Sequence, residues 1–170
     1  MTRLLGAALL IAGGGALGLG AVARLDGRVR DLGELAAGLD ALQRELGWRL
    51  SPLPQALNTA ARAVHGPAAD FFVRCAQGAE RGEGKRFQEV WGESLTAAPL
   101  RLKPEDGAFM ERLGPVLGRY DGDSQRLALE DAAAGLRSLQ GAASDDRSRL
   151  GRVYGVLGTA AGLLAAIVLL

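Results

Sequence analysis

The amino-acid sequence predicts an all-α protein, a cytoplasmic helical bundle of about six helices whose first and last helices continue into transmembrane helices. Three observations lead to this fold class. Charged residues are confined to the middle of the chain, and the apolar residues of that middle part recur at helical spacing. No stretch shows the sustained alternation of β-branched residues that is typical of a strand.

Charge divides the chain into three parts. All 19 acidic residues and all but one of the 20 basic residues lie between Arg24 and Arg152. The flanking runs 4–23 and 153–170 contain 20 and 18 residues without a charge. A helix rises about 1.5 Å per residue, so either run is long enough to cross the roughly 30 Å apolar core of a bilayer. We therefore predict a transmembrane helix at 1–23, a cytoplasmic helical domain at 24–152 and a second transmembrane helix at 153–170.

Arginines beside the two runs predict the orientation of the chain in the cell membrane. Three follow the first run and three precede the second, whereas Arg3 alone lies on an outer side: Arg24, Arg28, Arg30, Arg147, Arg149 and Arg152. By the positive-inside rule the central domain is cytoplasmic and both termini lie on the far side of the membrane. Ala21-Val22-Ala23 resembles a signal-peptidase site, and cleavage there would leave an exported, tail-anchored protein. The first run, however, exceeds the roughly 7–15 apolar residues of a signal peptide.

The helices of the central domain follow from apolar spacing and from residues that favour helix ends. The first helix carries an apolar stripe in steps of three and four: Leu25, Val29, Leu32, Leu35, Leu39, Leu42 and Leu46. No proline lies between 4 and 50, so this helix should continue without a break from the first transmembrane helix. Ser51 is expected to cap a second helix that begins at Pro52. Gly66 and Pro67 separate the second helix from a third.

Three further helices are predicted after a glycine-rich turn at 81–84. The first of them carries Phe87 and Trp91 on its apolar side. The next opens at Pro104 with two acidic residues in its first turn, and Pro115 is expected to kink it. The last begins near Asp123 and continues into the second transmembrane helix.

The sequence shows no pairing of a nucleophile with a base, and no group of residues that would bind a metal ion or a cofactor. The single cysteine, Cys75, falls on an apolar helical face, and the single histidine, His65, lies at a helix end. We expect a buried core thiol and an imidazole that is either hydrogen-bonded or solvent-facing, and neither a metal site nor a cofactor. A net charge of +1, with arginines interspersed among acids, argues against nucleic-acid binding. The sequence thus predicts a protein that is not an enzyme.

Glycine pairs spaced by four residues occur in both apolar runs: Gly14 with Gly18, Gly151 with Gly155, and Gly158 with Gly162. Small residues at this spacing let helices approach closely in lipid, so these pairs are candidates for packing of the two spans or of neighbouring subunits. An alanine- and glycine-rich composition alone would also place them there.

Taken together, the order and spacing of four segments resemble the stage III sporulation protein AB family over the whole chain. The segments are Arg3-Leu4-Leu5-Gly6-Ala7, Ser51-Pro52-Leu53-Pro54-Gln55-Ala56-Leu57, Leu117-Gly118-Arg119-Tyr120-Asp121 with Gln125, and Arg152-Val153-Tyr154. The sequence departs mildly from the family's pattern, with Ser51 where Thr is usual and Trp48 where Tyr is common.

The resemblance implies a structural role in the complex that joins mother cell and forespore during endospore formation. It implies residence in the mother-cell membrane around the forespore, and a soluble part similar to the cytoplasmic domain of the inner-membrane platform proteins of type II secretion and type IV pilus machines. The partners that the resemblance implies are the other subunits of the stage III sporulation complex, notably its AA ATPase. The lipid bilayer, from the two apolar runs, and further copies of the chain are the other expected partners. A small oligomeric transporter or pore-forming subunit is the alternative.

Two exposed breaks between helices are the candidate partner interface. The first comprises Ser51, Pro52, Leu53 and Pro54, and the second extends from Gly118 to Gln125 with Arg119 and Asp121. The same residues also serve ordinary turn and helix-start functions.

Overall fold

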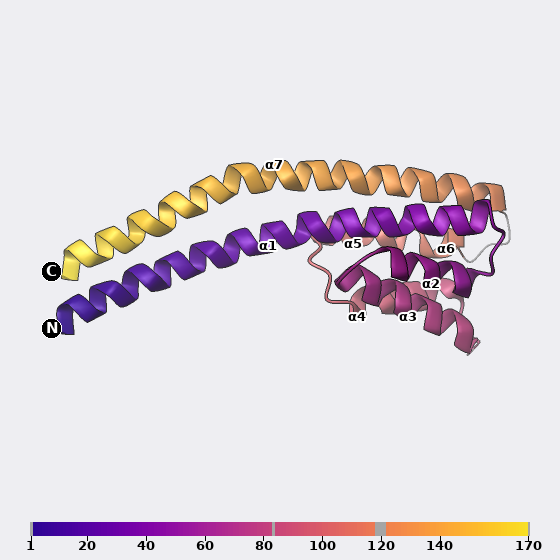
Figure 1. Cartoon of the computed structure of the whole chain (residues 1–170), viewed down its shortest axis with the longest axis horizontal. Helices are drawn as coiled ribbons and strands as arrows, with labels where there is room; N and C mark the ends of the chain where they lie inside the picture. Colours follow the sequence, from indigo (N-terminus) through magenta and orange to yellow (C-terminus); the bar gives the residue numbers. More distant parts are fainter. Residues whose placement is uncertain (1, 83, 118–121, 170) are drawn as a thin grey trace. The chain divides into compact units, whose positions relative to one another are not determined.

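The computed structural model describes residues 2–82, 84–117 and 122–169, with the side chains of 13, 20, 22–82, 84–117, 122–151, 153, 156 and 160. These ranges form seven helices and contain no strand, which confirms the all-α class (Figure 1). The helices are α1 (Thr2–Gly47), α2 (Leu53–Ala63), α3 (Pro67–Arg81), α4 (Phe87–Ala97), α5 (Pro104–Glu111), α6 (Gly114–Leu117) and α7 (Gly122–Leu169).

Backbone contacts divide the chain into two compact units, and α1 and α7 contribute to both. Arg30–Gln140 form one unit, which we call the bundle unit. Met1–Val29 and Gly141–Leu170 form the other, which we call the paired-helix unit.

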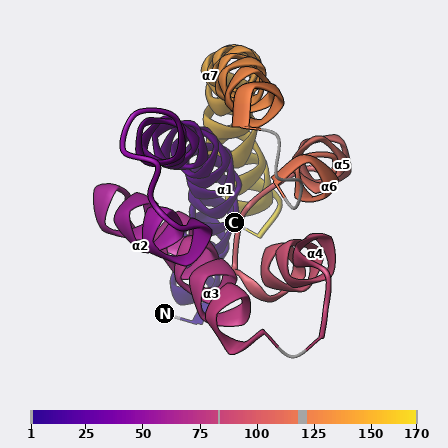
Figure 2. The ribbon, with the colours of Figure 1, turned by 90° about the vertical axis from the view of Figure 1, so that its right-hand side faces the viewer.

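In the bundle unit, successive helices follow one another around a common core (Figure 2). The predicted leucine stripe of α1 faces that core, where Leu32, Leu35, Leu39 and Leu42 are fully buried. The other helices contribute the remaining large side chains that are fully enclosed: Leu57, Phe71, Phe72, Trp91, Met110, Leu117, Leu129 and Leu136. The sequence-predicted bundle is therefore confirmed, with α1 supplying its longest apolar face.

Aromatic packing joins α3 to α4. The rings of Phe71 and Trp91 meet edge to face, with centroids 4.7 Å apart at an interplanar angle of 81°. The indole N–H of Trp91 donates a hydrogen bond of 2.8 Å to the carbonyl oxygen of Met110, the last residue but one of α5. One buried side chain thus contacts one neighbouring helix through its ring and another through its only polar atom.

Most predicted helix ends agree with the structure. α2 ends before Gly66, whose φ of 62° turns the chain into α3, and Pro67 stands at the first position of α3. Gly82, at φ 57°, ends α3 in the left-handed conformation. At the start of α5, the carboxylate of Asp106 accepts the backbone N–H of Lys103 at 2.9 Å.

The prediction of one helix kinked at Pro115 was wrong in form, because the structure has two separate helices there. α5 ends at Glu111 and α6 begins at Gly114. Pro115 has no N–H to donate to the carbonyl of Glu111, and its ring would collide with that carbonyl in a continuous helix. The chain instead forms a tight turn between the two helices, in which the N–H of Leu113 donates to the carbonyl oxygen of Met110 at 3.1 Å.

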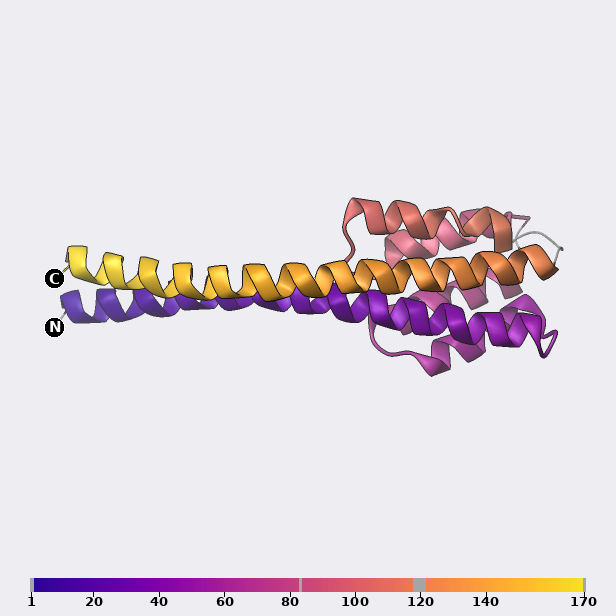
Figure 3. The same ribbon diagram turned by 90° about the horizontal axis from the view of Figure 1, so that it is seen from above.

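Within the paired-helix unit, α1 and α7 run side by side as antiparallel helices (Figure 3). Arg28, only 8% exposed, pairs with Asp146 at 3.8 Å, and Arg147 pairs with Asp26. In the described residues, no helix is long and apolar enough to cross a membrane. The predicted runs 4–23 and 153–170 consist mostly of residues whose side chains lie outside that description.

Substituting Gly38 tests the close contact between α1 and α3. A Cβ at this buried position would collide with the ring of Phe72, which is fully enclosed. We expect Gly38→Ala to lower the free energy of unfolding by about 1–3 kcal/mol, measured by urea denaturation of the full chain with circular dichroism.

Gly92 in α4 supplies the matched control, because a Cβ there meets nothing within 4 Å. Gly92→Ala should raise the free energy of unfolding by about 0.5–1 kcal/mol through helix propensity. Equal effects of the two substitutions would contradict the close packing of α1 against α3.

Candidate partner-binding site

A groove of about 560 Å³ lies at the end of the bundle unit where α1 ends and α7 begins. We call it the end groove. It unites the two predicted interface segments, because Ser51, Leu53 and Pro54 line it together with Gln125. Its other lining residues come from α1, α3, α4, α6 and the connections between them: Leu46, Leu50, Gly78, Ala79, Gly82, Lys85, Phe87, Val90 and Leu117.

Two large apolar side chains are exposed where the chain leaves α1: Leu50 lines the groove, and Trp48 precedes it by two residues. Trp48 is 81% exposed and Leu50 is 83% exposed, immediately after the end of α1. Leu50 has φ 50°, in the left-handed region, where a leucine costs about 1 kcal/mol or more relative to an ordinary conformation. Leu50 thus combines an unfavourable backbone conformation with an apolar side chain that is exposed to solvent.

Ser51 does not cap α2, so that prediction was wrong. The residue preceding α2 is Pro52, and no side chain caps the helix. The hydroxyl of Ser51 instead donates to Oε2 of Glu45 at 2.9 Å, and its backbone N–H donates to the carbonyl of Glu45 at 3.1 Å. Glu45 is 8% exposed and also accepts from Arg49 at 3.2 Å. The Ser51 hydroxyl therefore binds the carboxylate of Glu45 and not the backbone N–H groups at the start of α2. This bond connects the first predicted interface segment to α1.

Gln125 likewise has a structural contact within the bundle unit. Its Nε2 donates to the carbonyl oxygen of Leu117 at 3.0 Å, which satisfies an acceptor that the end of α6 leaves free. Pro52 is exposed and does not line the groove. The other residues of the second segment, Gly118, Arg119 and Asp121, lie outside the described residues.

Of the glycines proposed for membrane helix packing, the structure describes the surroundings of Gly151 only. A Cβ added there would meet Cγ2 of Val22 at 4.0 Å, an ordinary contact between α7 and α1. The surroundings of Gly14, Gly18, Gly155, Gly158 and Gly162 belong to the part whose side chains are not described.

Sequence reasoning missed three residues of the bundle unit, two at or next to the end groove and one near the start of the unit in α1. Leu50 lies four residues beyond Leu46, the last residue of the predicted stripe, but α1 has ended at Gly47 and the side chain of Leu50 is exposed. Trp48 lies off that stripe beside a helix break, which is a signal for exposure. Asp31 is 2% exposed and its carboxylate accepts the backbone N–H of Arg101 at 2.8 Å, so it ties the connection between α4 and α5 to α1.

The expected surroundings of the cysteine and the histidine are confirmed. Cys75 is fully buried, and burial raises the pKa of its thiol to about 12, so the thiol stays protonated at neutral pH. The side chain of His65 is 88% exposed, and its backbone N–H donates to Oε2 of Glu34 at 2.8 Å. Among the described residues, no three acidic, histidine or cysteine side chains are grouped as metal ligands would be.

The contact between Ser51 and Glu45 can be tested by substitution. Ser51→Ala removes a hydrogen bond to a largely buried carboxylate, and we expect the free energy of unfolding to fall by about 1–2 kcal/mol. Ser51→Thr keeps the hydroxyl and should lose less than about 0.5 kcal/mol. Urea denaturation of the full chain provides the measurement, and equal losses in the two variants would show that the hydroxyl is unimportant.

Comparison with known proteins agrees with the resemblance over the full length of the chain. The family model described as stage III sporulation protein AB matches residues 3–170. The stage III sporulation protein AB of Bacillus subtilis (strain 168) is 24% identical over 172 residues, covering 100% of both chains. A solved structure of a stage III sporulation protein AB aligns with a TM-score of 0.66 at 23% identity, covering 72% of this chain and 98% of that one, and so shows the same fold. The chain therefore belongs to the stage III sporulation protein AB family, and its role is in sporulation.

Proposed function

We propose that the protein is a non-enzymatic membrane platform of the sporulation channel complex, and that its end groove binds the cytoplasmic AA ATPase of that complex. The family supports the sporulation role. The proposed coupling role rests on the similarity to secretion and pilus platform proteins that the family resemblance implies. The single observation that carries the proposal is the end groove lined by the exposed Leu50, with the exposed Trp48 two residues before it in the chain.

The chemistry of this surface suits a protein partner better than a small polar substrate. Exposed tryptophan and leucine side chains gain free energy when a partner covers them, at roughly 25 cal/mol per Å² of apolar surface. Leu53, Phe87 and Leu46 extend the apolar lining into the groove. A partner that inserts an apolar anchor there would contact side chains from both predicted interface segments.

The strained conformation of Leu50 adds an independent argument. A residue that tolerates φ of 50° more readily, such as asparagine, would relieve the strain without loss of buried apolar surface, since Leu50 is 83% exposed. Folding therefore gives no reason for a leucine at this position, whereas binding of an apolar partner does.

The end groove connects through the backbone to the predicted membrane anchors. The residues beside it follow directly on α1, which is an unbroken helix from Thr2 to Gly47, and Gln125 lies in α7, which continues to Leu169. We propose that the runs 4–23 and 153–170 lie in the mother-cell membrane around the forespore, with the bundle unit in the cytoplasm and both termini on the far side. Movement of a bound ATPase would then reach the membrane through two continuous helices.

Leu50→Asn tests binding of the ATPase. We expect its capture of the purified ATPase to fall about tenfold, because an exposed apolar anchor is lost, while the free energy of unfolding stays the same or rises by about 1 kcal/mol. Binding is measured with the full chain in detergent or nanodiscs, and stability by urea denaturation.

Val73→Asn is the control, because Val73 is also an exposed apolar residue of the bundle unit, at 37%, but does not line the end groove. It should leave ATPase capture unchanged. Equal capture by the parent chain and Leu50→Asn would remove the end groove from the proposal.

Membrane topology is tested with single cysteines in spheroplasts of cells that produce the full chain. The buried, protonated thiol of Cys75 gives little background labelling. A membrane-impermeant maleimide should label Thr2→Cys in intact spheroplasts, but Ser138→Cys, at an exposed position of the bundle unit, only after permeabilisation. Labelling of Ser138→Cys in intact spheroplasts would contradict a cytoplasmic bundle.

A further inference from the structure

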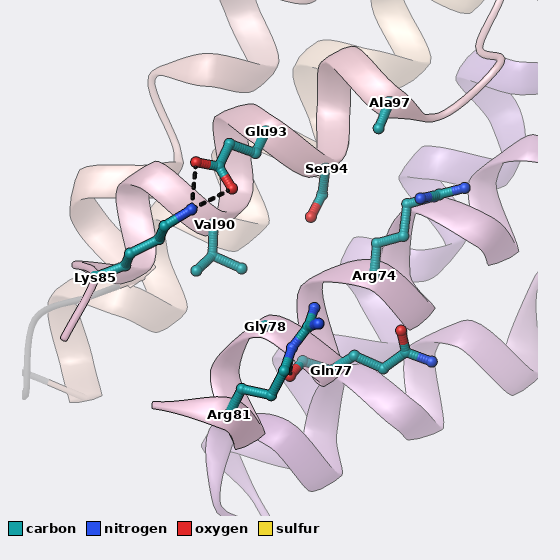
Figure 4. Close-up of a pocket in the computed structure, with 9 residues that line it drawn as sticks. All are labelled: Arg74, Gln77, Gly78, Arg81, Lys85, Val90, Glu93, Ser94 and Ala97. Carbon is teal, nitrogen blue, oxygen red and sulfur yellow. Dashed lines mark hydrogen bonds and ion pairs between the residues drawn. The ribbon is translucent and has the colours of Figure 1, made fainter. Parts of the chain in front are cut away.

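A second depression in the bundle unit lies between α3 and α4 and carries positive charge. It encloses about 320 Å³, and Arg74, Gln77 and Arg81 extend into its rim from α3 (Figure 4). Lys85, Glu93 and Ser94 lie on the opposite side. We call it the basic cleft. It shares Gly78, Lys85 and Val90 with the end groove and therefore adjoins it.

The charge of the basic cleft is incompletely balanced by its own residues. Lys85 pairs with Glu93 at 2.7 Å, which accounts for the single acidic side chain of the lining. Arg74 and Arg81 form no ion pair within the described part of the chain, and Arg81 donates only to the backbone oxygen of Gln77, at 3.3 Å. Two guanidinium groups are thus available for an anionic partner.

Gly78, Val90 and Ala97 form the apolar part of the lining of the basic cleft, which we call its floor. α3 and α4 approach closely there, because a Cβ at Gly78 would collide with Cγ1 of Val90. An incoming ridge with an apolar side chain between acidic ones would therefore match both the floor and the rim.

The outer face of α7 in the same unit carries such a ridge. Asp123, Leu127 and Glu130 follow one another on the exposed side of this helix, with Asp131 and Ala134 beside them. The opposite side of α7 is buried through Leu129, Ala133 and Leu136. We call the exposed set the acidic ridge. Its central residue, Leu127, is a leucine 56% exposed to solvent without any role in the core.

The spacing of charges on the two surfaces is the same. Arg74 and Arg81 are seven residues apart on α3, and Asp123 and Glu130 are seven residues apart on α7. Seven residues of helix correspond to a rise of about 10.5 Å. Gln77 lies between the two arginines and Leu127 between the two acids. One helix laid along the other can therefore pair both charges while its middle residue faces the cleft floor.

From this match we propose that the acidic ridge of one copy of the chain docks into the basic cleft of a second copy. In the bundle unit, α7 and α3 lie on opposite sides of the core (Figure 2), so a molecule cannot satisfy its own cleft. The contact joins two different surfaces. The copy that supplies the acidic ridge keeps an unoccupied basic cleft, and the copy that supplies the cleft keeps an unoccupied ridge. Such head-to-tail contacts close into rings or continue as open chains. The contact does not depend on ATPase binding.

Cysteine cross-linking tests the contact in membranes of cells that co-produce two differently tagged full-length variants. A short bismaleimide should join Gln77→Cys in one variant to Leu127→Cys in the other. It should not join two copies of Gln77→Cys. Raising the salt concentration should weaken the cross-link, since the attraction between exposed charges is screened.

Charge reversal tests whether the match of charges is responsible. Arg74→Glu with Arg81→Glu should lower the cross-linked fraction about tenfold. Adding Asp123→Arg with Glu130→Arg to the partner variant should restore it. Arg44→Glu with Arg62→Glu changes two exposed arginines outside the cleft and should have no effect. Circular dichroism of each variant confirms that the helices are retained.

Several outcomes would overturn the proposal: no cross-link between the two cysteine variants, cross-links only between identical variants, or cross-links that survive charge reversal. Loss of ATPase capture on reversing Arg74 and Arg81, without any cross-link between copies, would assign the basic cleft to the ATPase instead. Leu50→Asn should leave the cross-link intact, so the failure of this proposal and the failure of ATPase binding at the end groove are distinguishable.

Discussion

Burial of one leucine stripe on α1 is the constraint on which the bundle unit depends. Leu32, Leu35, Leu39 and Leu42 are fully enclosed, and the shorter helices surround them together with α7. α1 gains its stability from this burial more than from intrinsic propensity, since it carries glycines along its length. The absence of a side chain at Gly38 then lets Phe72 approach closely enough to close the core.

Elements set by local chemistry were predictable from the sequence. Helical spacing of apolar residues located all the long helices, and proline or glycine at their ends located most boundaries. Two features were not predictable because they depend on competition between nearby groups. Ser51 binds Glu45 in preference to the end of α2, and Pro115 separates α5 from α6 where a kink was expected. Neither outcome follows from the separate preferences of these residues.

The candidate site was predictable only in part. The sequence pointed to the breaks between helices, and the fold brings Ser51, Leu53 and Pro54 to the same groove as Gln125. The side chains that give this surface its apolar character, Trp48 and Leu50, were missed. Their exposure depends on where α1 ends, and the apolar spacing alone continues past that point. The match between α3 and α7 required the positions of exposed side chains on both helices.

The bond between Asp31 and Arg101 has a consequence for the junction of the two units. Asp31 lies in the first residues of α1 that belong to the bundle unit, and its buried carboxylate shields the amide of Arg101 in the connection before α5. Hydrogen exchange at that one amide therefore depends on the helical turn at the junction remaining intact. A local unwinding of α1 there would be detectable at an amide seventy residues further along the chain.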